Sequence, residues 1–202
     1  MVGQLHRESH TSHDAKPSLG SMPLDGLTRL WKRDACYTLG VASIAPNESS
    51  LGRCSRDLAV RCAERSGKRT LFLEAPRNSA RDGHRNTLPV AGLDLEERTW
   101  NCLSDALDAR GIDFRRAMAE LAEFSRLKHE YELIVVSLGD IASQSLARVG
   151  KLCDGIVLLF EPSPGGLPDW KRQMRDATPQ IRSHQSEGLC FVGVWHATVA
   201  PR

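Results

Sequence analysis

The chain has 202 residues, of which 41% are hydrophobic and 26% are charged, so it can bury the core of a globular domain and is too apolar for a disordered protein. Lys and Arg number 27 against 25 Asp and Glu, and the formal net charge of +2 gives no overall attraction to nucleic acid or to an anionic membrane. No apolar run approaches the ~18 residues of a membrane span, and the first residues contain no signal-peptide core. These features predict a cytoplasmic protein.

The six cysteines stand far apart in the sequence, with no C-x-x-C pair and no histidine at a ligand-like spacing. Because a chain of this size needs no disulfides for its stability, we expect free and mostly buried thiols. His6, His10 and His13 would share one face of a helix, but the polar segment around them is typical of a disordered tail. We therefore expect no metal site, a flexible N-terminal tail over residues 1–21 and a single domain over residues 22–202.

Apolar runs alternate with helical patterns along this domain. After an amphipathic segment at 24–34, the sequence predicts a buried strand over 38–45, a helix over 50–66 and a strand over 69–75. Residues 76–100 are rich in Arg, Asn, Asp and Gly and predict an exposed loop around one short element. The remaining chain predicts, in order, helices over 103–109 and 113–131, a strand over 132–138, a helix over 142–152, a strand over 155–161, a helix over 169–177 and a strand over 189–195.

Strands that are continuous apolar runs and alternate with helices are typical of a parallel sheet that is covered on both faces. The predicted fold is therefore an α/β domain with a doubly wound, mostly parallel sheet flanked by helices. Ligands of such folds bind at the carboxyl ends of the strands, which is where candidate functional residues are expected.

Four short motifs lie within or beside the predicted elements. The first long helix contains Asp57-Leu58-Ala59, and Gly67-Lys68-Arg69 follows that helix. The third motif is the segment 131–140, which begins with Tyr131 and includes a predicted strand. The fourth is Leu152-Cys153-Asp154-Gly155, at the start of the next predicted strand. They resemble the Asn-Leu-Ala, Gly-Lys-Arg, Tyr-Asp-Tyr-Val-Ile-Ile-Asp and Leu-Ala-Asp-Gly segments of bacterial tyrosine kinases of the capsular and exopolysaccharide type. Those kinases belong to the MinD/ParA class of P-loop ATPases. The resemblance spans most of residues 38–195 and implies a P-loop NTPase-like fold.

The phosphate-binding loop departs from the family's Pro-x-Gly-Glu-Gly-Lys-Ser-Thr pattern. In that pattern backbone N–H groups cradle phosphates, the lysine neutralises charge and a hydroxyl holds magnesium. This sequence lacks the lysine and those glycines, and it places Glu48 where a triphosphate would lie. The lysine position falls on Ser50 or, one residue later, on Leu51, and Arg53 is the nearest cation. The candidate nucleotide-binding positions thus form a degenerate loop of Asn47, Glu48, Ser49, Ser50, Leu51, Gly52 and Arg53.

The acidic motifs of the family are also altered. The segment Leu-Leu-Ile-Asp-Ala-Asp becomes Leu71 to Pro76 with Glu74 as its only carboxylate, and the metal-linked Asp falls on Ser137. One interpretation pairs Glu74 with Asp140 as a replacement magnesium site, since both lie at carboxyl ends of strands. The interpretation that we favour makes Asp140 the N-cap of the next helix and Glu74 a solvated strand end. The sequence therefore assigns no catalytic residue.

The family's C-terminal tyrosine cluster is missing, because Tyr37 and Tyr131 are the only tyrosines. With these departures, the resemblance implies a catalytically inactive protein that acts as a regulatory or scaffolding partner in exopolysaccharide biosynthesis or export, without a cofactor. It implies a protein partner, either a membrane polysaccharide co-polymerase or an active paralogous kinase, which would recruit the protein to the inner membrane. Trp170 is a candidate contact with that partner. The resemblance leaves homo-oligomerisation open.

Two alternatives also stay open. One is a divergent ATPase or protein tyrosine kinase that uses ATP and magnesium, with Glu74, Asp140 and Arg53 in altered roles. The other is an anion- or nucleic-acid-binding module based on the segment from Arg53 to Arg85, where nine basic residues face four acidic ones. For this segment we favour a solvated helix face and a polar loop, and we expect no nucleic-acid partner.

Overall fold

The structure is a computed structural model of the chain, and it describes residues 36–44, 48–74, 92–99, 107–108, 111–112, 114–160 and 168–196. The predicted N-terminal tail and the amphipathic segment that follows it lie outside these ranges.

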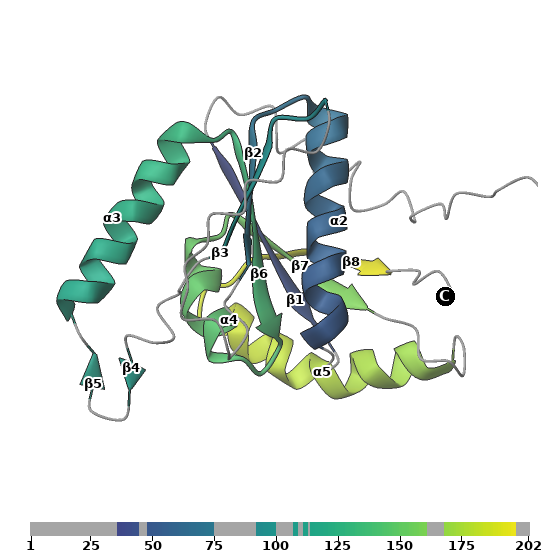
Figure 1. The fold of residues 1–202 in the computed structure, drawn as a ribbon. Coiled ribbons are helices and arrows are strands. Elements are labelled where there is room, and N and C mark those ends of the chain that lie inside the picture. The colour runs from purple at the N-terminus through teal and green to yellow at the C-terminus, as the bar shows by residue number, and fades with distance from the viewer. Residues whose placement is uncertain are drawn as a thin grey trace, which may run out of the picture.

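Six strands form one sheet in which every pairing is parallel (Figure 1). Their order across the sheet is β3-β2-β6-β1-β7-β8. The central strands are buried along almost their whole length, as their continuous apolar runs predict. The strands are β1 (Tyr37–Ser43), β2 (Thr70–Glu74), β3 (Leu95–Thr99), β6 (Leu133–Asp140), β7 (Gly155–Phe160) and β8 (Phe191–His196).

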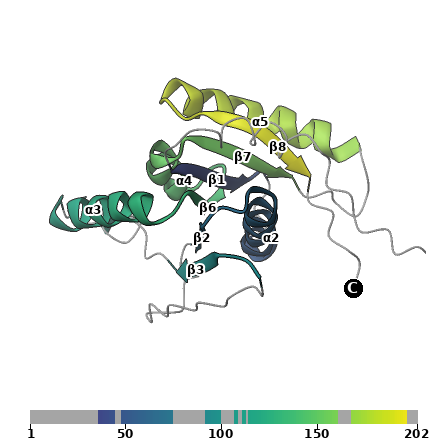
Figure 2. The same ribbon diagram turned by 90° about the horizontal axis from the view of Figure 1, so that it is seen from above.

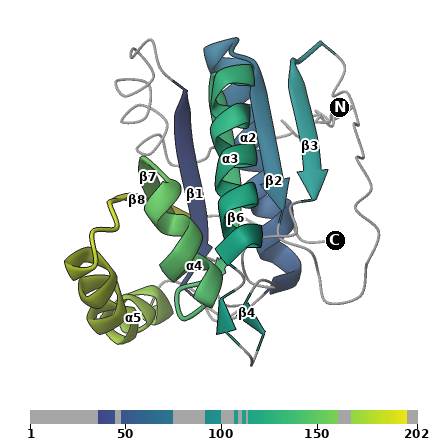
Figure 3. The same cartoon turned by 90° about the vertical axis from the view of Figure 1, so that its left-hand side faces the viewer.

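Helices cover both faces of this sheet, so the predicted doubly wound α/β fold is confirmed (Figure 2). One face packs against α2 (Glu48–Ser66). The other packs against α3 (Phe114–Glu130), α4 (Gln144–Val149) and α5 (Pro168–Ser186), and a short 3₁₀ turn, η1 (Gly150–Leu152), follows α4. Figure 3 shows α3 in front of β6 and β2.

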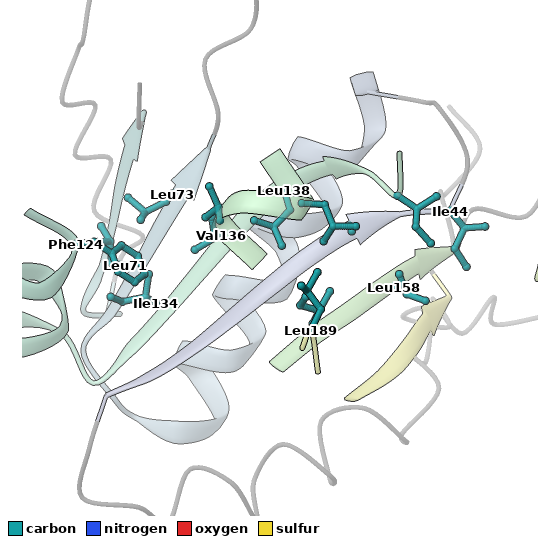
Figure 4. Packing of buried hydrophobic residues seen from close by; sticks show 14 of the residues in the cluster. Ile44, Leu71, Leu73, Phe124, Ile134, Val136, Leu138, Leu158 and Leu189 are labelled. Atoms are coloured by element: carbon teal, nitrogen blue, oxygen red, sulfur yellow. The ribbon is translucent and has the colours of Figure 1, made fainter. Parts of the chain in front are cut away.

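The period-two alternation of β6 divides the core into two layers. Leu133 and Val135 belong to the layer under α2, whereas Ile134, Val136 and Leu138 belong to the layer under the other helices. Figure 4 shows this second layer, which Phe124 of α3 and Leu189 join from outside the sheet. All five strand residues are 3% exposed or less, so burial of aliphatic side chains is the main stabilising term for the sheet.

The predicted helix over 103–109 is wrong. Leu107–Asp108 forms a short strand, β4, which pairs antiparallel with Gly111–Ile112, β5. A helical pattern of seven residues is too short to offset the cost of helix nucleation, and a nearby glycine favours a tight hairpin.

The last helix continues beyond its predicted end at residue 177. It passes through Pro179 and ends at Ser186. The proline removes the backbone donor that would bond the Arg175 carbonyl. The Thr178 hydroxyl donates to a different carbonyl oxygen, that of Met174, at 2.6 Å. Met174, Ala177 and Ile181 pack against the sheet on the opposite side, so tertiary packing holds the helix together where local propensity alone would end it.

Candidate functional site

The carboxyl edge of the sheet is where a ligand of this fold would bind. Alternation along each strand places Ser43, Glu74 and Ser137 on the face that α2 covers, because their neighbours in β1, β2 and β6 belong to the opposite core layer. Ser137 pairs in register with Val41, and Glu74 follows the pair of Leu73 with Val136. Glu74 and Ser137 are therefore level with each other on adjacent strands.

The degenerate loop leads directly into α2. Asn47 lies outside the described residues, and of Glu48, Ser49 and Ser50 the structure describes only the backbone, which is helical from Glu48 onward. The first turn of a helix leaves backbone N–H groups free, and these are the groups that bind phosphates in P-loops.

Leu51 occupies one of the two positions at which the family has its lysine. Its side chain is 3% exposed and packs in the layer that contains Cys54 and Leu58. Gly52 is buried beside it, whereas Arg53 is exposed on the surface of α2. The side chain at position 51 is therefore committed to the core and cannot reach a phosphate.

Asp140 does not cap the following helix, so that expectation is wrong. The N-cap of α4 is Ser143, whose Oγ accepts a hydrogen bond from the Leu146 N–H at 3.1 Å and donates to the Leu138 carbonyl at 2.7 Å. Asp140 closes the turn before it, since its Oδ1 accepts from the Ala142 N–H at 2.8 Å. The sequence pattern pointed to Asp140 alone, and the geometry of the turn selects Ser143 instead.

The strand register separates Glu74 from Asp140. Asp140 pairs with Ser43, and the ladder between β1 and β6 is irregular just before this pair. Gly139 in the irregular stretch has φ +83°, a conformation that favours glycine. Because Asp140 pairs with Ser43, it lies two residue levels beyond the level of Glu74, which corresponds to about 7 Å along a strand. Within the described part of the chain, no group of three or more His, Cys, Asp or Glu side chains could hold a metal ion.

Ser137 stands where the family has its metal-linked carboxylate. Its side chain is 7% exposed, and among the described residues it takes part in no hydrogen bond or ion pair. A neutral hydroxyl at this position supplies no charge to attract a cation, and a charged side chain there would need a partner because of its burial.

Two of the described thiols have raised pKa values. Burial raises the pKa of Cys62 to about 12, and burial is also the largest cause that raises the pKa of Cys36 to about 11. Thiols with such pKa values remain protonated near neutral pH. The five described cysteines are all free, as predicted, but the expectation that they are mostly buried is wrong. Cys54 and Cys62 are buried, Cys36 and Cys153 are half-buried, and Cys190 is exposed.

The amino-terminal half of the sheet holds contacts that sequence reasoning did not foresee. The Thr38 N–H donates to Asp154 Oδ2 at 2.7 Å, and the Asp154 N–H donates to the Thr38 carbonyl at 2.8 Å. A Cβ atom on Gly155 would lie 2.4 Å from the Tyr37 hydroxyl. The Asp-Gly motif therefore joins β7 to the start of β1, and the match to a family motif was the only signal for it.

A polar cluster fixes the edge strand β3 to the start of β6. The Tyr131 hydroxyl donates to Glu96, and Arg98 donates to the Tyr131 oxygen at 2.9 Å and pairs with Glu96 at 2.6 Å. Burial alone would raise the pKa of Glu96, but the hydrogen bonds from Arg98 and Tyr131 outweigh it and hold the pKa below its usual value. The Arg69 guanidinium lies 4.8 Å from the centre of the Tyr131 ring.

Several solved structures are similar to this chain. The kinase domain of the Escherichia coli tyrosine kinase ETK is similar over 87% of this chain and 75% of its own length, with a TM-score of 0.53 and 15% identity. MinD in the MinC:MinD complex of Aquifex aeolicus is similar over 79% and 68%, with a TM-score of 0.53 and 14% identity. A ParA family ATPase from Chlorobium tepidum is similar over 80% and 73%, with a TM-score of 0.51 and 10% identity.

At these identities the similarity shows the fold alone. The chain has the P-loop NTPase-like fold of the MinD/ParA class, and its structural neighbours include bacterial tyrosine kinase domains. No protein-family model and no curated protein matches the sequence. Among the helices that the structure describes, none has the length and apolar character to cross a bilayer.

Proposed function

We propose that the chain is a P-loop ATPase-like protein without ATP chemistry, and that it acts as a regulatory or scaffolding partner of another protein. The observation that carries this proposal is the burial of Leu51 at 3% exposure, in the first turns of the helix that follows the degenerate loop. A leucine in the core cannot neutralise a phosphate, and its position leaves Arg53 on the exposed surface of the helix.

The acidic positions support the same proposal. Ser137 replaces a metal-linked carboxylate, and Glu74 and Asp140 stand at different levels of the sheet. A magnesium ion that bridges phosphates needs oxygen ligands that converge on one point. Glu74 and Ser137 are level on adjacent strands, but Ser137 is neutral and Asp140 lies about 7 Å further along, so the two carboxylates are not side by side.

The resemblance to capsular and exopolysaccharide kinases suggests where the protein acts. We place it in exopolysaccharide biosynthesis or export, as a cytoplasmic protein that a membrane polysaccharide co-polymerase or an active paralogous kinase recruits to the inner membrane. Trp170 remains a candidate contact, although the structure describes only its backbone, within α5. No cofactor is needed for this role.

Isothermal titration calorimetry with ATP tests the proposal, with and without magnesium. We expect no binding heat for the wild type. The positive control replaces residues 47–52 with Gly-Glu-Gly-Lys-Ser-Thr and adds Ser137→Asp. Because this graft removes a buried leucine, Leu51→Ser alone serves as its matched control. Saturable heat for the wild type would contradict the proposal.

A second candidate is a divergent ATPase or protein tyrosine kinase, and the position of Glu74 favours it. Glu74 keeps a carboxylate at the carboxyl edge, on the face of the sheet next to α2. Phosphate release should be measured for the wild type and for the double variant Glu74→Ala with Asp140→Ala. Release by the wild type that disappears in the double variant would establish the enzyme and overturn the inactive role.

A further inference from the structure

The outer face of α5 carries an excess of positive charge. This helix contains four cationic and two acidic residues, so its excess of two equals the formal net charge of the whole chain. Lys171, Arg172, Arg175 and Arg182 are all exposed. The helix α5 thus presents a basic outer face at the surface.

Three of these cations form one stripe. At 100° per residue, Lys171, Arg175 and Arg182 fall within about 40° of one another around the helix axis, on the side opposite Ala177. The rise of ~1.5 Å per residue separates them by about 6 Å and then by about 10 Å. Among the described residues, none of the three has an ion pair, whereas Arg172 pairs with Asp176 at 3.9 Å.

The stripe is held in place by the packing of the helix. Met174, Ala177 and Ile181 bury its inner face against the sheet, and His184 Nε2 lies 2.8 Å from the Ile141 carbonyl oxygen in hydrogen-bonding geometry. Figure 2 shows α5 as the outermost element beside β7 and β8. Three unpaired cations are therefore displayed at fixed spacing on a supported helix.

We propose that this stripe is a docking surface for an acidic helical segment of a partner protein. An α-helix with carboxylates at positions i, i+4 and i+11 has the same rise and the same angular spread, so each carboxylate can meet one cation. Charge complementarity of this kind selects partners and speeds association more than it adds affinity. The inference rests on the partner-binding role proposed above and names the chemistry of the partner.

Two other anionic partners fit the stripe less well. A bilayer would hold a basic helix firmly only if apolar side chains also inserted. The exposed large hydrophobic residues among those described are Met118 on α3 and Val192 on β8, not on α5. Duplex DNA is bound non-specifically through many phosphate contacts, and three cations on one line supply few of them.

Fluorescence anisotropy with a labelled helical peptide tests the proposal. The probe is an alanine-based peptide with glutamates at positions i, i+4 and i+11, titrated with the full chain in 50 mM and in 300 mM salt. The test variant is Arg175→Glu with Arg182→Glu. The matched control is Arg61→Glu with Arg65→Glu on α2, which changes the net charge equally on the opposite face of the sheet. Circular dichroism confirms that each variant is folded.

We expect the α5 variant to weaken binding at least tenfold and the α2 control to weaken it less than twofold. We also expect the added salt to weaken wild-type binding several-fold. No binding by the wild type, equal losses in both variants, or tighter binding to duplex DNA or phosphatidylserine vesicles would each overturn the proposal. None of these outcomes alters the calorimetric result with ATP, so the two proposals fail separately.

Discussion

The two ends of the parallel sheet use their polar side chains in different ways. At the amino-terminal end, the polar groups pair across elements: Asp154 with the backbone of Thr38, and Tyr131 with Glu96 and Arg98. At the carboxyl end, Ser137 has no partner among the described residues, and Asp140 and Ser143 bond only within their own turn. Among the described residues, these side-chain bonds at the amino-terminal end join different strands, whereas the side-chain bonds of Asp140 and Ser143 at the carboxyl end stay within one turn.

The family motifs follow this division. Gly67 has φ +63° and its N–H donates to the Ala63 carbonyl at 2.9 Å, so it ends α2 as a left-handed cap. The Gly-Lys-Arg, Tyr and Asp-Gly segments all lie at the amino-terminal end and have a structural reason for their residue types. The motifs that carry phosphate and metal chemistry lie at the carboxyl end, and there the residues differ.

The largest effect should come from Gly155→Ala. The new Cβ would lie 2.4 Å from the Tyr37 hydroxyl and 2.7 Å from Val192 Cγ1. Overpacking between β1, β7 and β8 should lower the free energy of unfolding by about 2–3 kcal/mol. Urea denaturation measures this loss of unfolding free energy. The control is Gly193→Ala on β8, where a Cβ meets nothing within 4 Å, and equal losses in the two variants would contradict the account.

Asp154→Ala should have the next largest effect. It leaves the N–H of Thr38, a fully buried residue, without its acceptor at 2.7 Å, which costs about 1–2 kcal/mol. Asp154→Asn keeps an oxygen acceptor and should recover most of the loss. If the asparagine variant is as unstable as the alanine variant in urea denaturation, the hydrogen bond to β1 is not the stabilising contact.

Tyr131→Phe should lower the free energy of unfolding by about 1 kcal/mol at neutral pH, because Glu96 loses one of its two hydrogen-bond donors. The folded-state pKa of Glu96 lies below its ordinary value of 4.5. The interactions of ionised Glu96 therefore stabilise the folded protein at pH values above 4.5. This stabilisation disappears as the pH falls through the lowered folded-state pKa. The difference in the free energy of unfolding between Tyr131→Phe and the wild type should therefore become smaller at acidic pH. A difference that stays constant from neutral pH to pH 3 would exclude Glu96 as its source.

Ser137→Ala should have the smallest effect. Ser137 is 7% exposed, and its hydroxyl has no partner within the described residues, so its removal should change the free energy of unfolding by less than about 0.5 kcal/mol. Ser137→Asp should destabilise the protein, because it buries an unpaired charge. A large loss in the alanine variant, measured by urea denaturation, would reveal a role for this hydroxyl that the structure does not account for.

The sequence was sufficient to predict the fold because the signals for the strands are long and apolar. The runs around Leu133–Leu138 and Gly155–Phe160 have one physical outcome, a strand buried on both faces. The pairing of Leu107–Asp108 with Gly111–Ile112 was not predictable, because a helical pattern of seven residues is too short to decide between helix and strand. The continuation of α5 past Pro179 was not predictable, because it depends on the packing of Met174, Ala177 and Ile181 against the sheet.

The candidate site was harder to predict for the same reason. Residue type alone could not show that Leu51 enters the core or that Ser143 replaces Asp140 as the cap, because both depend on where α2 and α4 begin. The sequence also did not reveal that three cations of α5 share one side of the helix. Arg182 lies beyond the predicted end of this helix, so the stripe is recognised only when the full length of α5 is known.

The most direct test of the central claim is a thermal melt of the wild-type protein with millimolar ATP and magnesium. A ligand that binds only the folded state at a hundredfold excess over its Kd adds ~2.7 kcal/mol to stability and raises the Tm visibly. With Leu51 in the core and Ser137 in place of a carboxylate, we predict no change in Tm. A clear rise in the wild-type Tm that Glu74→Ala with Asp140→Ala abolishes would contradict the account and identify a working nucleotide site.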